Sequence, residues 1–94
     1  MPFLINYMTY NHQLKQSTLY GTSVSYVKLK PLGILDVWCM RYGTSVMGNQ
    51  LAMKRALAIT QKVPVLVHPI QQIYFFPTIS ATDHQCIWIN AKNI

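Results

Sequence analysis

The side chains with the clearest chemical potential in this sequence are its cations. Eight Lys and Arg stand against only two Asp and Glu, which gives a formal net charge of +6 at pH 7. Lys54 and Arg55 are adjacent, and further cations lie on both sides of them: Lys28, Lys30, Arg41 and Lys62. Because Lys and Arg neutralise phosphates, this balance favours a polyanionic partner. We predict phosphate contacts for these residues; the alternative is a basic surface that faces only solvent.

Carboxylate chemistry is restricted by count. Asp36 and Asp83 are the only acidic side chains, and their spacing does not predict a shared cleft. Hydrolysis by paired carboxylates needs two acids across one bond, and hard cations need several oxygen ligands. We therefore expect a protein that is not an enzyme.

The thiols and imidazoles are dispersed along the chain. Cys39 and Cys86 form no CxxC pair, and the three histidines, His12, His68 and His84, lack the spacing of a zinc site. We expect no bound metal and no cofactor. Both cysteines have apolar neighbours, so buried structural thiols are favoured over exposed redox-sensing ones.

The bulk composition predicts one small domain over residues 1–94. The chain is 51% hydrophobic and only 11% charged, which is far from the composition of disordered chains. A surface with so few charges must expose apolar patches, and large patches mark interfaces. We expect a homo-oligomer. The start of the chain lacks the features of a signal peptide, and no apolar run is long enough to span a bilayer, so we expect a cytoplasmic protein without a membrane partner.

Alternation of side chains predicts strands at both ends of the chain. Residues 3–10 and 19–29 are rich in Thr, Val and Tyr and are expected to form an N-terminal β-hairpin. Residues 63–77 predict a strand, a turn and a second strand, with Pro77 at the end of the second or at a sheet edge. Residues 85–91 alternate again, with Cys86, Trp88 and Asn90 on one side.

Two short helices are predicted between these strands. Pro31 suits the first turn of one helix and Gly43 the residue after it. Thr44 or Ser45 can cap a second helix, whose core face is expected to hold Val46, Met53 and Leu57. The fold class is therefore α+β: an N-terminal β-hairpin, two short helices, then an antiparallel three-strand segment.

Two blocks of the sequence resemble a known family. Residues 30–49 (KPLGILDVWCMRYGTSVMGN) and 64–90 (PVLVHPIQQIYFFPTISATDHQCIWIN) are similar to the competence transcription factor ComK in the order and spacing of their Pro, Gly, Cys and Trp residues. The resemblance implies a transcription activator of the genes for DNA uptake. It also implies recognition of AT-rich duplex, largely through the minor groove, by an oligomer arranged as a dimer or a dimer of dimers.

The sequence also departs from that family. Family members are about twice as long, so the segment that an adaptor uses to deliver them to a Clp protease is expected to be absent. At Asn49, Gln50 and Asp83 the family pattern has basic residues, and Lys54 and Arg55 are the candidates to restore that charge. Asn49, Gln50 and Gln85 can either read the acceptors of A·T pairs or act in caps and turns. The alternative function is a truncated oligomerisation module that binds DNA weakly or not at all.

Overall fold

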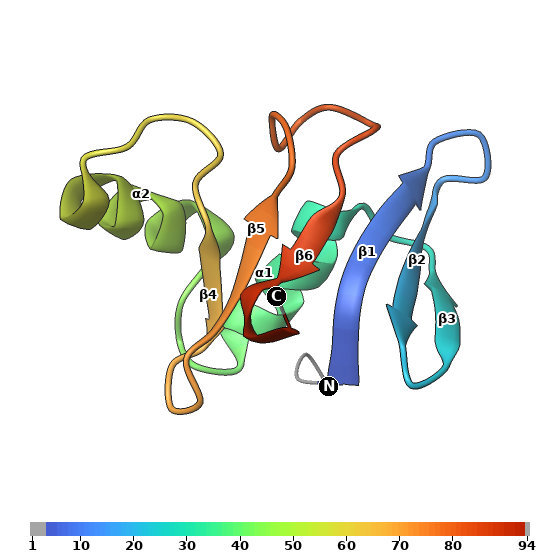
Figure 1. Ribbon diagram of the computed structural model, residues 1–94, viewed down its shortest axis with the longest axis horizontal. Coiled ribbons are helices and arrows are strands. Elements are labelled where there is room, and N and C mark those ends of the chain that lie inside the picture. Colours follow the sequence, from blue (N-terminus) through green and yellow to red (C-terminus); the bar gives the residue numbers. More distant parts are fainter. Residues whose placement is uncertain (1–3, 94) are drawn as a thin grey trace.

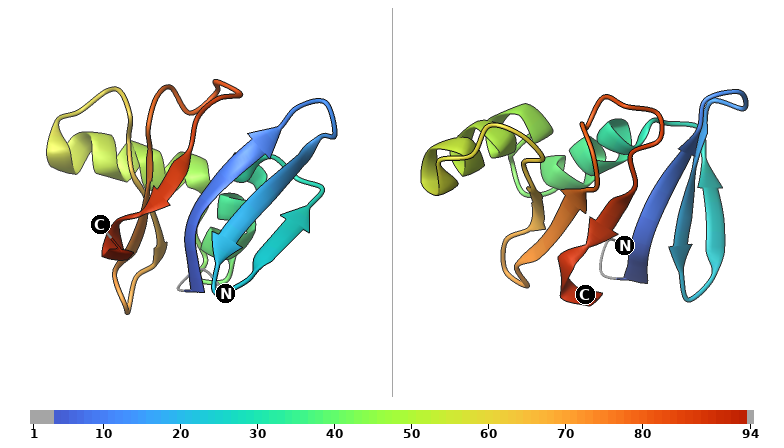
Figure 2. Two further views of the ribbon diagram at one scale, coloured as in Figure 1. Left: turned by 45° about the vertical axis from the view of Figure 1, so that its right-hand side comes forward. Right: turned by 45° about the horizontal axis from the view of Figure 1, so that its top comes forward.

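The computed structural model describes residues 4–93. This part of the chain forms six strands, two α-helices and a final 3-10 turn, in the order β1 (Ile5–Asn11), β2 (Gln16–Gly21), β3 (Val24–Val27), α1 (Pro31–Met40), α2 (Val46–Leu57), β4 (Val65–His68), β5 (Ile73–Pro77), β6 (Trp88–Asn90) and η2 (Ala91–Asn93). The α1 helix lies across one face of the sheet, and α2 lies beside β4 (Figures 1 and 2). The mixture of helices and antiparallel strands confirms the α+β prediction.

All described strands belong to one antiparallel sheet with the order β3-β2-β1-β6-β5-β4. The predicted antiparallel three-strand segment is present as β4, β5 and β6, but it is continuous with the N-terminal strands, which the prediction did not include. The last strand, β6, lies between β1 and β5 and pairs Met8 with Trp88. The buried side chain of Asn90 secures this junction, because its Nδ2 donates to the carbonyl of Ile5 at 3.0 Å. Alternation identified the strand but carries no information about its neighbours.

The N-terminal hairpin is a three-stranded meander, because the strand predicted over 19–29 breaks at Thr22 and Ser23. Gly21, just before this break, approaches the backbone closely, and any Cβ there would collide with the carbonyl of Leu4. The chain reverses there, and the Gly21 N–H donates to the Ser23 carbonyl at 3.1 Å. The predicted start of the first strand at Phe3 lies outside the described residues.

The first helix follows its predicted signals closely. Pro31 occupies the first turn of α1. The last helical residue is Met40, and Arg41 is the C-cap residue that follows it. Gly43 has a φ of 71°, the left-handed conformation that glycine adopts most readily. The buried ring of Trp38 packs against Phe75 of β5, with centroids 5.5 Å apart. This contact lies in the main core, which also contains Met8, Leu19, Ile34, Leu35, Val65, Val67, Ile73 and Trp88.

The second helix has the predicted cap and most of the predicted core face. Ser45 Oγ accepts from the Gly48 N–H at 3.0 Å, and Asp36 Oδ1 accepts from the Val46 N–H at 2.8 Å. Val46 is buried as expected, whereas Leu57 is 52% exposed. Met53 is half-buried, so the predicted face is confirmed at Val46 and Met53 and is wrong only at Leu57, near the end of the helix.

We predict opposite effects of alanine at two glycines. Gly21→Ala should lower the free energy of unfolding by about 1–3 kcal/mol, because the methyl group overlaps rigid backbone. Gly33→Ala, inside α1, meets only ordinary contacts with Leu29 and should raise it by up to about 1 kcal/mol through helix propensity. Urea unfolding followed by circular dichroism measures both, and equal effects at the two positions would contradict the close approach.

Candidate nucleic-acid interface

Two of the predicted cations, Lys54 and Lys62, line one groove of about 390 Å³. Three segments meet there. The α2 helix contributes Gln50 and Lys54, one turn apart; the loop after it contributes residues 60–63; and the loop after β5 contributes Ser80 and Ala81. The groove therefore joins parts of the chain that are distant in sequence.

The loop between α2 and β4 owes its path to two left-handed residues. Ala58 has a φ of 55° and Lys62 a φ of 53°. Such conformations are uncommon for residues other than glycine, and here each turns the chain sharply. Val63 and Pro64 are buried and anchor the loop to the body of the domain, while residues 60–62 stay exposed. The Lys62 side chain is thereby held at the same groove as Lys54.

The chemistry of the groove suits an anion. The described residues that line it provide two ammonium groups, two amides and two hydroxyls, and neither Asp36 nor Asp83 is among them. Lysine and neutral hydrogen-bond donors are the groups that proteins use on phosphate and sugar.

The second helix is held beside the sheet by the side-chain amide of Asn49. Its Nδ2 donates to the Leu66 carbonyl at 2.7 Å, and its Oδ1 accepts from the Leu66 N–H at 2.9 Å. Asn49 thus occupies the place that a further strand would take beside β4. Its amide is committed to the fold, so we leave Asn49 out of the proposed DNA contacts. Because successive helical residues differ by about 100°, turning Asn49 toward β4 directs Gln50 and Lys54 away from it.

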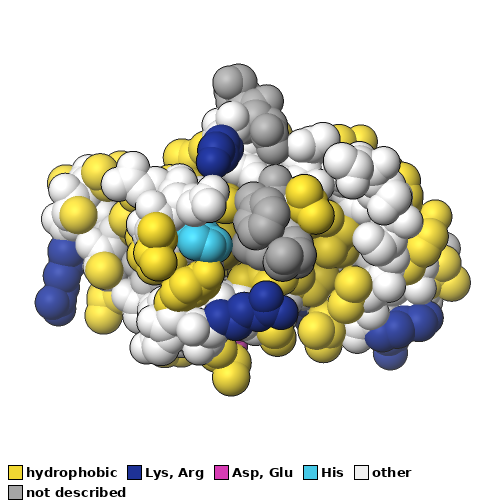
Figure 3. Space-filling model, turned by 90° about the horizontal axis from the view of Figure 1, so that it is seen from below, with side chains coloured by type: hydrophobic (Ala, Val, Ile, Leu, Met, Phe, Trp, Pro, Cys, Tyr) yellow, Lys and Arg dark blue, Asp and Glu magenta, His cyan; other side chains and the backbone are white. Residues whose placement is uncertain are grey.

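The remaining predicted cations do not join this groove. Arg55 is exposed and lies about 100° further round α2 than Lys54. Lys30 and Arg41 flank opposite ends of α1, and the Lys28 Nζ donates to the Leu14 carbonyl at 3.3 Å. Figure 3 shows Lys and Arg spread over one face of the molecule with hydrophobic side chains between them. The predicted cations therefore form one small cluster and several isolated charges.

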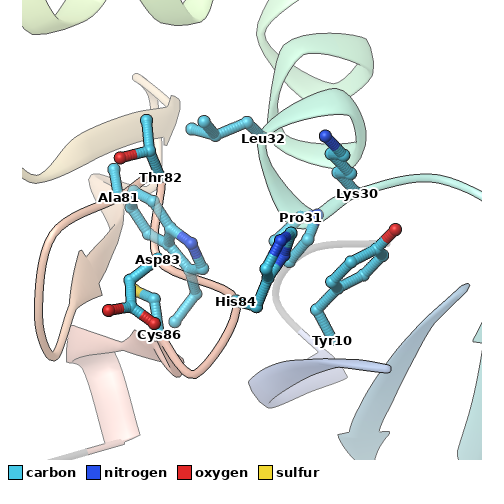
Figure 4. A pocket seen from close by; sticks show the side chains of 10 residues that line it. Tyr10, Lys30, Pro31, Leu32, Ala81, Thr82, Asp83, His84 and Cys86 are labelled. Carbon is cyan, nitrogen blue, oxygen red and sulfur yellow. The ribbon is translucent and has the colours of Figure 1, made fainter. Parts of the chain in front are cut away.

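A second cavity, of about 120 Å³, lies between the start of α1 and residues 81–86. It is lined by Lys30 together with Pro31, Leu32 and the ring of His84, and the carboxylate of Asp83 lies across it from the Lys30 ammonium (Figure 4). Asp83 accepts from the Gln85 N–H at 2.8 Å, which places Gln85 in a turn. With one cation and an apolar lining, this cavity is a poor site for a polyanion.

The two thiols are buried and unpaired, as expected from their neighbours. Burial, followed by the charge of Asp36, raises the pKa of the Cys39 thiol to about 11. Its Sγ lies 3.7 Å from the Leu66 carbonyl, the same carbonyl that Asn49 binds. In residues 4–93 no three His, Cys, Asp or Glu side chains are placed to hold a metal ion. Neither α-helix of this part is long and apolar enough to cross a membrane.

Sequence reasoning missed five residues at the groove: Thr60, Gln61, Val63, Ser80 and Ala81. They lie in loops and carry no motif, so only the fold brings them to Lys54. Gln61 could have been found because it precedes Lys62, a predicted phosphate contact. Nothing in the sequence relates Ser80 to the other groove residues.

Comparisons with known proteins agree on one family. A family model described as ComK protein matches residues 3–94. A protein of Bacillus subtilis (strain 168), named competence transcription factor, is 42% identical over 71 residues, which is 76% of this chain and 37% of that relative. The chain thus matches well under half of the length of the relative. A search of solved structures gave no match.

We predict that Asn49→Ala lowers the free energy of unfolding by about 2 kcal/mol, because it leaves the N–H and the carbonyl of Leu66 without their amide partner. Gln50→Ala, which removes the neighbouring amide on the groove side, should change it by less than about 0.5 kcal/mol. Chemical denaturation compares the two. Equal losses would show that the contact with β4 contributes little.

A second prediction concerns the Cys39 thiol. Because its pKa is about 11 in the folded chain against 9.0 for the free group, the unfolded chain loses this proton first as the pH rises. The contribution of the protonated Cys39 thiol to the free energy of unfolding is complete below pH 9 and declines between pH 9 and pH 11. Urea unfolding at pH 8 and pH 10 should show a smaller decline for Cys39→Ala than for the unchanged chain. Identical declines would contradict the raised pKa.

Proposed function

The chain belongs to the ComK family, and we propose that it acts as a competence transcription factor that binds double-stranded, AT-rich DNA. The observation that supports this best is the groove in which Lys54 and Lys62 lie beside Gln50 with no carboxylate among its described lining residues. In this proposal the lysines contact phosphates of the DNA backbone. Such contacts position a protein on duplex and supply affinity that depends on salt.

The preference for A·T pairs would come from the neutral donors of the same groove. The minor groove of A·T pairs presents only acceptors, the adenine N3 and thymine O2 atoms. The amides of Gln50 and Gln61 can donate to such acceptors, and the narrow minor groove of A-tracts attracts cations. Arg55 is close enough along α2 to reach a neighbouring phosphate. Lys28, Lys30 and Arg41 are left as secondary contacts outside the groove.

The small number of groove cations supports binding as an oligomer. Two phosphate contacts per copy correspond to a slope of log K against log salt of only about −2, which is weak binding. Two or more copies on adjacent sites multiply these contacts without new chemistry. We therefore propose a homo-oligomer in the cytoplasm as the DNA-binding form.

The dispersal of the other cations favours a second candidate (Figure 3). In this alternative the chain is an oligomerisation module of the same family that pairs with copies of itself and binds duplex only weakly. The two candidates make different predictions for DNA binding.

We predict that the chain binds an AT-rich duplex more tightly than a mixed duplex of the same length, with affinity that falls steeply as salt rises. Lys54→Gln/Lys62→Gln should weaken binding at low salt and reduce the slope of log K against log salt by about 2. Fluorescence anisotropy of labelled duplexes over a salt series measures both quantities.

The matched control is Lys15→Gln/Lys92→Gln, which removes the same charge outside the groove and includes a lysine with a φ of 52°, close to that of Lys62. If both double variants reduce the slope equally, the groove is not the contact site. A stable oligomer that binds neither duplex would overturn the DNA-binding proposal and support the oligomerisation module.

A further inference from the structure

The two edges of the sheet differ in how well their backbone is protected. At the β4 edge, Asn49 pairs with both backbone groups of Leu66, and Pro64 and Pro69 flank the strand. At the opposite edge, no described element lies beyond β3, which ends the sheet on the right in Figure 1. Proteins usually guard such edges with charge, proline or a covering segment.

Apart from its short length, the β3 strand carries none of these guards. Its four residues, VSYV, include no charge and no proline, and Val24 and Tyr26 are 51% and 65% exposed. β-Branched and aromatic residues are those that stabilise strand pairing. This edge is therefore open and well suited to accept another strand.

The ladder between β2 and β3 shows which backbone groups point outward. The Gly21 N–H bonds to the Ser23 carbonyl, and the register pairs Leu19 with Ser25. Hydrogen-bonded pairs alternate along an antiparallel ladder, so Ser25 and Val27 bond to β2. Val24 and Tyr26 then direct their N–H and carbonyl groups away from the sheet.

We propose that β3 of one copy pairs antiparallel with β3 of a second copy, with Ser25 facing Ser25 across a two-fold axis. In this register Val24 of each copy faces Tyr26 of its partner, and both residues exchange backbone hydrogen bonds. Aromatic and β-branched side chains are favourable cross-strand pairs, and the small Ser25 lies at the axis. The six-stranded sheets of the two copies become one continuous sheet.

The uncharged β3 edge fits a second copy as the occupant. Two copies with a net charge of +6 repel one another overall, and β3, whose four residues carry no charge, adds nothing to that repulsion. In the proposed register Lys28 lies opposite Thr22 of the partner, so the two Lys28 side chains are far apart. An acidic partner would gain nothing from an edge without charge. This inference rests on the proposal that the chain acts as an oligomer.

Disulfide trapping tests the register directly. In an antiparallel pair without mutual hydrogen bonds, the Cα atoms are about 4.5 Å apart, which a disulfide can span. We expect Ser25→Cys to form a covalent dimer with oxidised glutathione, as seen on a non-reducing gel. The control Thr22→Cys is also exposed, but its two copies would lie about 20 Å apart, so it should stay uncrosslinked. The native Cys39 and Cys86 are buried in both variants.

A second variant tests the backbone bonds. Tyr26→Pro removes an outward N–H while leaving the ladder to β2, so it should weaken the dimer at least tenfold in sedimentation equilibrium, with an unchanged circular dichroism spectrum. Met47→Ala, which shortens an 81% exposed side chain on α2, should leave it unchanged. If Tyr26→Pro unfolds the chain, the comparison of Ser25→Cys with Thr22→Cys crosslinking tests the paired edge instead.

The outcomes separate this inference from the proposed function. A monomer at every concentration overturns both the oligomer and the paired edge. A dimer that crosslinks through Ser25→Cys no faster than through Thr22→Cys overturns the paired edge alone. If Lys54→Gln/Lys62→Gln abolishes DNA binding but leaves the Ser25→Cys crosslink intact, the proposed function and the paired edge are both supported. The groove and the edge then act independently. A dimer that crosslinks through Ser25→Cys but never binds duplex supports the edge and overturns the DNA-binding function.

Discussion

The position of α2 depends on the contact between Asn49 and the β4 edge. An unpaired N–H and carbonyl at a sheet edge need partners, and one primary amide supplies both for Leu66. The apolar packing of the helix is limited, since Val46 is its one buried residue and Met53 is half-buried. Polar contacts from Ser45 and Asp36 fix its start, and Asn49 fixes its rotation. Without that rotation, Lys54 would not face Lys62 across the groove.

The groove gathers charge by convergence of loops rather than by a basic helix. Lys62 reaches it because Ala58 and Lys62 turn the chain and because Val63 and Pro64 anchor the turn. Carboxylates are so few in this chain that the two ammonium groups meet no acidic side chain among the described lining residues. A modest number of cations can therefore produce a local positive potential.

Local signals predicted the elements well and their assembly poorly. Pro31, Gly43 and Ser45 act at helix ends, where a single residue controls backbone conformation or hydrogen bonding. The insertion of β6 between β1 and β5 depends on contacts between segments more than 70 residues apart, which no local pattern encodes. The site follows the same rule: the charges of Lys54 and Lys62 were visible in the sequence, but their shared groove with Ser80 was not. The pairing of the Asn49 amide with Leu66 was likewise not visible, because the sequence does not show that β4 lies beside α2.

The contrast between the two sheet edges relates the fold to assembly. The groove is formed by α2 and the loops before β4 and after β5, and the open β3 edge lies at the other end of the same sheet. A two-fold axis through paired β3 strands, normal to the sheet at that point, would place the two grooves toward opposite ends of the continuous sheet. At about 4.8 Å per strand, the two β4 edges would lie about 50 Å apart along the sheet. Two copies would then contact a duplex at two separate places more than one helical turn apart, and neither groove would have to share its phosphates. Asn49 closes the β4 edge, so the β3 edge is the one where two copies can pair. Such pairing would combine the weak DNA contacts of two grooves.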